Sequence, residues 1–174
     1  MKKSVKIILL VVVVALLGAS LYFLKVDKNT NKNMVVLQIP EETVTQIRFQ
    51  AMLYSDREVV IEKDEQNGLW KCEDVYIKEV FTKDIFNVIK DLRAKTEITS
   101  PDDLSQYGFD SPRVIINIKT TTDNYEIIIG GYNATEKAYY FKVSGSDSVY
   151  VTEDGSKLNY AFEYDTDAFI NAQK

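Results

Sequence analysis

Four closely spaced segments in the second half of the chain limit its fold most tightly, because in each of them apolar and polar side chains alternate. They are rich in the Val, Ile, Tyr and Phe residues that favour β-strands, and they cover Arg113–Lys119, Asn124–Gly131, Ala138–Ser144 and Ser148–Thr152. Short turns join them, such as Thr121–Asp123. Connections of this length join antiparallel strands, since a parallel pair needs a crossover of about a dozen residues or more. The sequence therefore predicts an antiparallel sheet.

Weaker alternating patterns stand earlier in the chain. They predict a three-strand meander that starts near Val44, continues through Glu58–Lys63 and ends around Trp70. The pair Asn67-Gly68 is expected to supply the two positive-φ residues of a tight hairpin between the last two strands. Trp70 is expected to bury its ring in the core.

One helical pattern follows the meander. Ile85, Phe86, Ile89 and Leu92 recur at the spacing of one helix face, and charged residues take most of the other positions. This predicts an amphipathic helix of about twelve residues with Thr82 as its N-cap. Together the patterns predict an α+β domain with a mainly antiparallel sheet of about six or seven strands in meanders and hairpins, one principal helix and short capped helices.

Turn chemistry explains the stretch between the helix and the second group of strands. Ser100 is expected to cap a short helix with Pro101 at its first position, and Gly108 is expected to end it in a left-handed conformation. We interpret this stretch as a structural corner. Gly130-Gly131 indicates a β-bulge or turn, since neither a helix nor a cation follows to make a phosphate cradle.

The N-terminal apolar run is long enough to cross a membrane. Ile7 to Leu24 contains no charge and would span about 27 Å as a helix. We expect an uncleaved signal anchor, with a cleaved signal peptide as the alternative, because the run exceeds the usual ~7 to 15 residues of a signal peptide core. Lysines before the run favour a cytoplasmic N-terminus at residues 1–6. Residues 25–37 would be a linker, and residues 38–174 an extracytoplasmic domain.

The charge of that domain excludes one class of partner. From Val26 onward the chain carries 17 Lys and Arg against 26 Asp and Glu, a net charge of −9. A surface this acidic repels phosphate backbones, so we expect no nucleic-acid partner. The single cysteine, Cys72, permits no internal disulfide and is expected to be a small buried residue.

Few residues are suited to catalysis. The chain has no histidine, which removes the commonest general base and the imidazole metal ligand. Acidic pairs occur at Asp102-Asp103, Glu153-Asp154 and Asp165 with Asp167, and we interpret them as solvated turn and cap residues. We therefore predict a protein that is not an enzyme, with no catalytic residues, no cofactor and no metal site. Tyr132, Tyr140 and Tyr150 are the candidate interaction patch, on the face of two hairpins that would turn away from the core.

The order of these signals resembles that of an uncharacterised bacterial family, a domain of unknown function. The resemblance rests on the strand with Trp70, the amphipathic helix, "YGFDSP" at Tyr107–Pro112, "IIIGG" at Ile127–Gly131 and "YYFKV" at Tyr139–Val143, and it covers roughly Gln46 to Tyr164. Such domains are typically anchored by an N-terminal helix or lipid and are often encoded beside gliding-motility-type ABC transporter components. The resemblance implies an extracytoplasmic accessory domain and carries over no catalytic residues.

Three functional hypotheses follow. The first is a membrane-tethered, extracytoplasmic, non-enzymatic domain that contacts the bilayer through Ile7 to Leu24 and binds an envelope or transporter protein. The second is a sensor or carrier that binds a small molecule or glycan near the loop from Tyr132 to Tyr140. The third is a hydrolase that acts through carboxylates.

Overall fold

The computed structural model describes residues 33–52, 57–153, 157–158 and 160–173. The expected cytoplasmic N-terminus at 1–6, the expected membrane anchor at 7–24 and the linker up to residue 32 lie outside the described residues. Within the ranges that are described, no helix combines the length and the apolarity needed to cross a bilayer.

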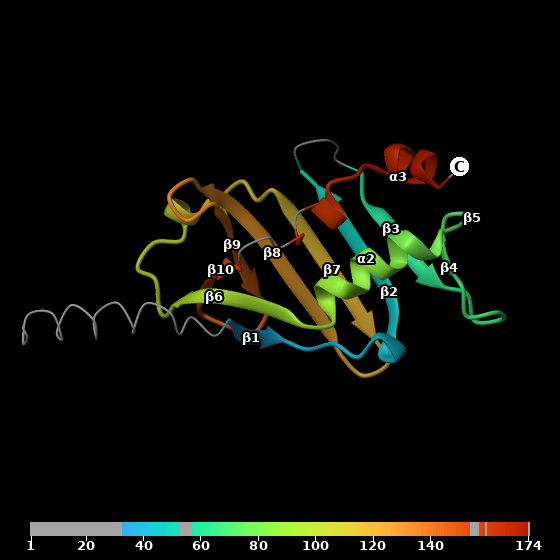
Figure 1. Cartoon of the computed structure of the whole chain (residues 1–174), viewed down its shortest axis with the longest axis horizontal. Coiled ribbons are helices and arrows are strands. Elements are labelled where there is room, and N and C mark those ends of the chain that lie inside the picture. Colours follow the sequence, from blue (N-terminus) through green and yellow to red (C-terminus); the bar gives the residue numbers. More distant parts are fainter. Residues whose placement is uncertain (1–32, 53–56, 154–156, 159, 174) are drawn as a thin grey trace, which may run out of the picture. The chain divides into compact units, whose positions relative to one another are not determined.

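The described part of the chain folds into one ten-stranded sheet in which every neighbouring pair is antiparallel (Figure 1). In chain order its strands are β1 (Met34–Leu37), β2 (Val44–Ala51), β3 (Val59–Lys63), β4 (Trp70–Cys72), β5 (Val75–Tyr76), β6 (Leu92–Ile98), β7 (Val114–Thr120), β8 (Asn124–Asn133), β9 (Ala138–Val143) and β10 (Val149–Thr152). The sheet order is β1-β6-β10-β9-β8-β7-β2-β3-β4-β5. The helices are α2 (Glu79–Ile89) and α3 (Thr166–Ala172), and the single 3-10 turns are η2 (Glu41–Thr43), η3 (Ser105–Tyr107) and η4 (Tyr160–Phe162).

The predicted α+β class and antiparallel sheet are confirmed, but the sheet has more strands than the expected six or seven. Three strands were missed. Met34–Leu37, assigned to the linker, is strand β1 and pairs with β6. The pattern of β6 was missed because only Leu92 and Ala94 are buried among charged neighbours, so the strand carries little apolar alternation. The two-residue strand β5 is too short to give any pattern.

The sheet must curl, and the path of α2 shows why. β5 and β6 stand eight positions apart in the strand order, which is about 38 Å in a flat sheet at ~4.8 Å per strand. The chain between them comprises α2 and six further residue steps, which together reach about 35 Å. The strands therefore wrap around the helix, and Figure 1 shows α2 crossing the face of the sheet between β5 and β6.

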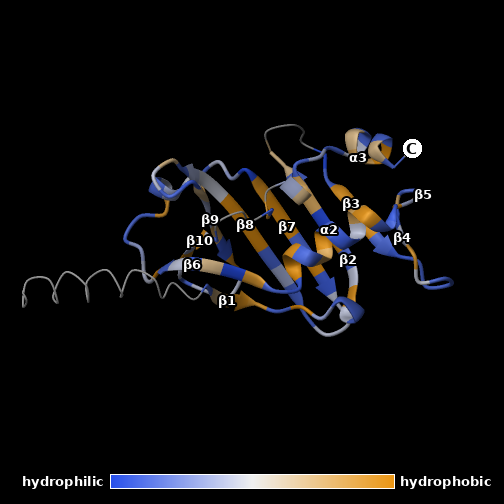
Figure 2. Cartoon of the chain, in the orientation of Figure 1, coloured by the Kyte–Doolittle hydropathy of each residue, from blue (hydrophilic) through white to orange (hydrophobic). Residues whose placement is uncertain are grey.

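The core lies between α2, the inner face of the sheet and the C-terminal segment, by which we mean the part of the chain that carries η4 and α3. Phe49 on β2 sits in one cross-strand row with Ile116 on β7 and Ile127 on β8, and all three are fully buried. The Phe49 ring meets the rings of Phe162 and Phe169 edge-on, with centroids 5.2 and 5.8 Å away. In Figure 2 the central strands β7 and β8 are mostly orange, which marks them as hydrophobic. Burial of this row fixes the register, since a one-residue slip would turn every side chain outward.

Helix α2 follows the predicted pattern with different ends. It begins at Glu79, and its N-cap is Lys78 rather than Thr82, whose hydroxyl donates to the Glu79 carbonyl at 3.0 Å from inside the first turn. Ile85, Phe86 and Ile89 are buried as predicted. Phe86 packs on Trp70, with ring centroids 5.2 Å apart, which confirms Trp70 as a core residue. Leu92 belongs to β6 and not to the helix.

Two turns differ from their predicted form. Of the pair Asn67-Gly68 only Gly68 has a positive φ, and the β3–β4 turn is wider than a two-residue hairpin, with the Asp64 amide donating to the Leu69 carbonyl at 2.8 Å. No helix begins at Ser100, which itself has a positive φ of 49°. The short helix starts later, at Ser105, where the Asp103 side chain accepts from the Ser105 amide at 2.8 Å. Asp103, and not Ser100, is therefore the residue whose side chain accepts a hydrogen bond at the start of this short helix.

The corner itself is confirmed, and it packs on the glycine bulge. Gly108 ends η3 in a left-handed conformation with φ 78°, and β8 gains one residue against β9 between Ile129 and Tyr132. A Cβ built on Gly130 would lie 2.4 Å from the Tyr107 carbonyl oxygen, and one built on Gly108 would lie 2.6 Å from the Gly131 nitrogen. Glycines are needed here because two backbone segments touch.

Candidate functional site

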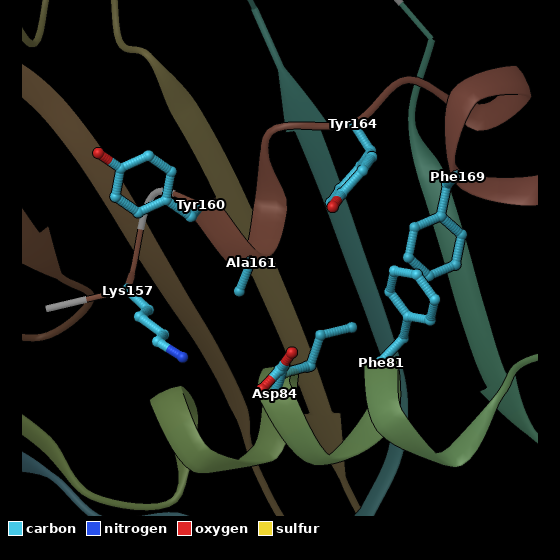
Figure 3. Close-up of a pocket in the computed structure, with 8 residues that line it drawn as sticks. Phe81, Asp84, Lys157, Tyr160, Ala161, Tyr164 and Phe169 are labelled. Carbon is cyan, nitrogen blue, oxygen red and sulfur yellow. The ribbon is translucent and has the colours of Figure 1, made fainter. Parts of the chain in front are cut away.

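A pocket of about 450 Å³ opens between α2 and the C-terminal segment (Figure 3). Its walls are mainly aromatic and aliphatic, and it is lined by Phe81, Asp84, Ile85, Lys157, Tyr160, Ala161, Tyr164 and Phe169. In Figure 3 the rings of Phe81 and Phe169 lie together at one end, and the Asp84 carboxylate and the Lys157 amine approach from opposite walls at the other. The small side chain of Ala161 points inward between these ends. This volume is within the ~300 to 1,000 Å³ typical of ligand pockets.

The apolar end is held in place by a chain of edge-to-face aromatic contacts. Phe169 is 1% exposed and sits at the centre of the group. Its ring centroid lies 6.2 Å from that of Phe81 on α2 and 5.8 Å from that of Tyr164. Such pairs contribute roughly 0.5 to 1.5 kcal/mol each beyond their burial. The wall of the pocket is therefore an extension of the core.

Polar contacts hold α3 against the body of the domain. Asp165 is its N-cap and accepts from the Ala168 amide at 2.6 Å. The Thr166 hydroxyl donates to the Glu58 carbonyl beside β3 at 2.8 Å. At the other end of α3 the Gln173 side chain accepts from the amide of Lys78, just before α2, at 2.9 Å. These bonds fix α3 against the segment before β3 and against the start of α2.

An ion pair fixes the segment between η4 and α3. The Arg113 guanidinium donates to Glu163, whose side chain is only 13% exposed. The same guanidinium carbon stands 5.4 Å from the centre of the Tyr139 ring. Burial raises the pKa of Tyr139, with Arg113 opposing the shift and Glu163, Tyr160 and Tyr132 adding to it. Tyr132 and Tyr160 thus lie near Tyr139, on the side of the sheet that carries the C-terminal segment.

A second, more polar pocket of about 260 Å³ adjoins the first and shares Asp84 and Lys157 with it. It is lined by Asp84, Asn87, Val88, Asp91, Leu92, Arg93, Glu153 and Lys157. Asp91 accepts from the Arg93 side chain through Oδ2 at 2.8 Å, and its other oxygen, Oδ1, is buried and accepts no hydrogen bond from the described residues. We call the two pockets together the α2 groove.

The structure disperses the three tyrosines of the expected interaction patch. Tyr150 is 7% exposed and stacks on Phe141 with ring centroids 5.3 Å apart, so it is a core residue and not part of a surface. The ring of Tyr140 packs on Tyr107 of the corner, at 4.9 Å. Tyr132 is 55% exposed and packs instead on Tyr139, which it faces across β8 and β9. Consecutive residues of a strand point to opposite faces, so Tyr132 and Tyr140 lie on opposite faces of the sheet.

Three of the acidic residues singled out in the sequence, Asp103, Asp165 and Asp167, have structural partners. Asp103 accepts from Ser105, and this hydrogen bonding lowers the pKa of its carboxyl. Asp165 caps α3, and Asp167 lies 3.5 Å from Arg57 at the surface. Asp154 lies outside the described residues. Across the described ranges, no three His, Cys, Asp or Glu side chains gather as metal ligands would.

Sequence reasoning did not find the α2 groove. Asp84 was only one of the charged positions of the predicted amphipathic helix, and no functional role was predicted for Tyr164 or Phe169. The two walls lie more than seventy residues apart in the sequence. The one local signal was a second aromatic residue, Tyr160, two positions before Phe162, and in the fold Tyr160 is 66% exposed while Phe162 is buried.

A comparison with protein-family models gives one finding. The model described as "Domain of unknown function (DUF4340)" matches residues 82–170, just over half of the 174 residues. The matched part includes the corner, the glycine bulge and, except for Phe81, every residue that lines the first pocket. The comparisons with curated proteins and with solved structures gave no match.

Proposed function

Because this chain belongs to the family of the domain of unknown function DUF4340, we propose that it is a membrane-tethered, extracytoplasmic accessory domain that binds a protein partner and catalyses no reaction. The partner we favour is a component of an ABC transporter or of another envelope complex. The uncharged run from Ile7 to Leu24 supports the tether, and the lysines that precede it support the extracytoplasmic side for the rest of the chain.

The first pocket of the α2 groove is the observation that carries this proposal. It is an aromatic cavity open to solvent, and Tyr160, which is 66% exposed, stands at its rim. Tyr132, whose ring packs on Tyr139 with centroids 5.0 Å apart, is 55% exposed. Tyrosine is enriched at protein interfaces, and an anchor side chain of a partner typically fills a pocket of this kind. A partner would bury these rings and insert a side chain beside Ala161.

Site-specific cross-linking tests the interaction. A photoreactive phenylalanine analogue replaces Tyr160 in the full chain, and the cells are irradiated. We expect a discrete adduct with an envelope protein, and we expect Ala161→Trp, which fills the pocket, to remove it. The matched control places the analogue at Thr122, an exposed position in the β7–β8 turn. Equal adducts from both positions, or none from Tyr160, would contradict the proposal.

The tether and its orientation have a separate test. A C-terminal tag on the full chain should stay with the membrane fraction in alkaline carbonate, and deleting residues 7–24 should release it. Protease added to intact spheroplasts should remove the tag. A tag that is protected in spheroplasts and digested only after lysis would place the domain in the cytoplasm.

Binding of a small molecule or glycan is the second candidate, favoured by the size of the same pocket. In that case the full chain should be stabilised by a sugar or peptide of the envelope in a thermal-shift screen, and Ala161→Trp should abolish the shift. The small molecule or glycan would then fill the pocket without a partner protein.

A further inference from the structure

The α2 groove has an apolar half and a charged half, and together they define what could occupy it. We propose that the partner presents an extended segment that carries an aromatic residue and, about two to four residues away, a lysine or arginine. The aromatic side chain fills the first pocket and the cation lies in the second. This inference rests on the proposed protein-binding function and adds the chemistry of the bound segment.

The two pockets adjoin and share two lining residues. Asp84 and Lys157 line both of them, and a bound segment that leaves the first pocket would pass these two side chains to reach the second. Asp84, Val88 and Asp91 follow one another along α2 and the residues just after it at a spacing of three or four. Residues at this spacing lie on one side of a helix. The track of such a segment therefore runs along α2.

The first pocket suits an aromatic side chain. Phe81, Tyr164 and Phe169 present ring edges and faces around its apolar end. The Tyr164 hydroxyl makes no hydrogen bond with any described residue, and in Figure 3 it points down and to the left, into the pocket. A further ring would extend the edge-to-face group, at roughly 0.5 to 1.5 kcal/mol for each new pair.

Charge favours a cation in the second pocket. Asp84, Asp91 and Glu153 line it, against Arg93 and Lys157. The Arg93 guanidinium is already engaged by Asp91 at 2.8 Å and by the Asn33 carbonyl at 3.5 Å. Lys157 forms no ion pair with a described residue, and it is placed to donate to a backbone carbonyl of the bound segment.

Asp91 gives the charged half a specific acceptor. Its buried Oδ1 lacks a hydrogen-bond donor among the described residues, and a covered carboxylate oxygen without a donor is costly. A lysine or arginine that draws this carboxylate toward the second pocket would supply the missing donor. Charge-assisted hydrogen bonds of this type are the stronger ones in proteins.

The length of the track sets the spacing in the partner. Asp91 stands seven positions after Asp84, which is about 10 Å along a helix at ~1.5 Å per residue. An extended segment covers the same distance in about three residues at ~3.3 Å each. The flexible stem of a lysine or arginine widens this to about two to four.

Four labelled peptides test the proposal by fluorescence polarisation with the full chain in detergent. Each is blocked at both ends, and their cores are Phe-Ser-Gly-Lys, Phe-Ser-Gly-Gln, Ala-Ser-Gly-Lys and Phe-Ser-Gly-Glu. We expect the Phe/Lys peptide to bind at least tenfold more tightly than the Phe/Gln and Ala/Lys peptides, and the Phe/Glu peptide to bind most weakly. Equal affinity of the Phe/Lys and Phe/Gln peptides, or tighter binding of the Phe/Glu peptide, would overturn the proposal.

Variants assign each half of the peptide to its half of the groove. Asp91→Asn should erase the preference for Lys over Gln and keep that for Phe over Ala, and Ala161→Trp should do the reverse. Glu65→Gln, an exposed acid in the β3–β4 turn, is the control and should change neither. If no peptide binds while Tyr160 still cross-links to a protein, this inference fails and the proposed function stands. If the cross-link is also absent, both fail.

Discussion

Replacing Gly130 with alanine should destabilise the domain strongly, because the new methyl group has no space. Its carbon would lie 2.4 Å from the Tyr107 carbonyl oxygen and 2.9 Å from Cε1 of Phe109. Both distances are shorter than 3.0 Å, and Cβ atoms in proteins essentially never approach another heavy atom that closely. The carbonyl belongs to a backbone held by the Gly108 amide, which donates to the Ser105 carbonyl at 3.0 Å. The corner must therefore move away from β8 as a unit.

The expected loss follows from that movement. Separating the carbonyl from the methyl carbon to 3.0 Å requires about 0.6 Å, and overpacking of this kind costs about 1 to 3 kcal/mol. The shift also loosens the Tyr107–Tyr140 ring pair, now at 4.9 Å, which is worth roughly 0.5 to 1.5 kcal/mol. We expect a decrease of about 2 to 4 kcal/mol in the free energy of unfolding, or about 5 to 15 °C in Tm.

Urea unfolding measures this change, since the single tryptophan, Trp70, is buried and reports loss of the core. Gly131→Ala is the matched control in the same bulge, because its Cβ would lie 3.4 Å from the nearest atom, an ordinary contact. That variant should lose less than about 1 kcal/mol. If the two variants lose equal stability, close approach is not the reason for the glycine at 130.

Three further outcomes are expected. Gly108→Ala combines a φ of 78° with a backbone contact at 2.6 Å, so its free energy of unfolding in urea should fall by about 3 kcal/mol. Gly68 has a φ of 74° but open space around it, so Gly68→Ala should lose only about 1 kcal/mol. Similar losses in the two variants would show that the backbone contact does not matter. Burial raises the pKa of Cys72 from 9.0 to about 11, so the folded state holds this proton more tightly. Its contribution to stability is complete below pH 9 and is lost as the pH rises toward 11, which comparison with Cys72→Ala over that range would detect. Glu163→Gln should lower stability by about 1 to 3 kcal/mol, because the half-buried Arg113 loses the negative charge of Glu163, and an unchanged urea midpoint would count against that role.

Local sequence was sufficient for the elements whose signal lies within a few residues. The four strands from 113 to 152, the buried face of α2 and the left-handed Gly108 all follow from alternation, helical spacing and turn chemistry. The burial of Trp70 and Cys72 was also predicted correctly. The signals for these features lie in the neighbouring residues of the chain, and the features appear in the fold as those signals predict.

Tertiary structure decided the faces and the groove. The one-residue bulge at Gly130-Gly131 reverses the alternation of β8, so Tyr132 faces the C-terminal segment while Tyr140 faces the corner. The groove exists because the curled sheet brings α2 against a segment that ends the chain. Its two walls are separated by β6 to β10, and nothing in either wall's own sequence specifies the other. The two walls come together only when the whole sheet has curled around its core, and this curl depends on how all the strands pair.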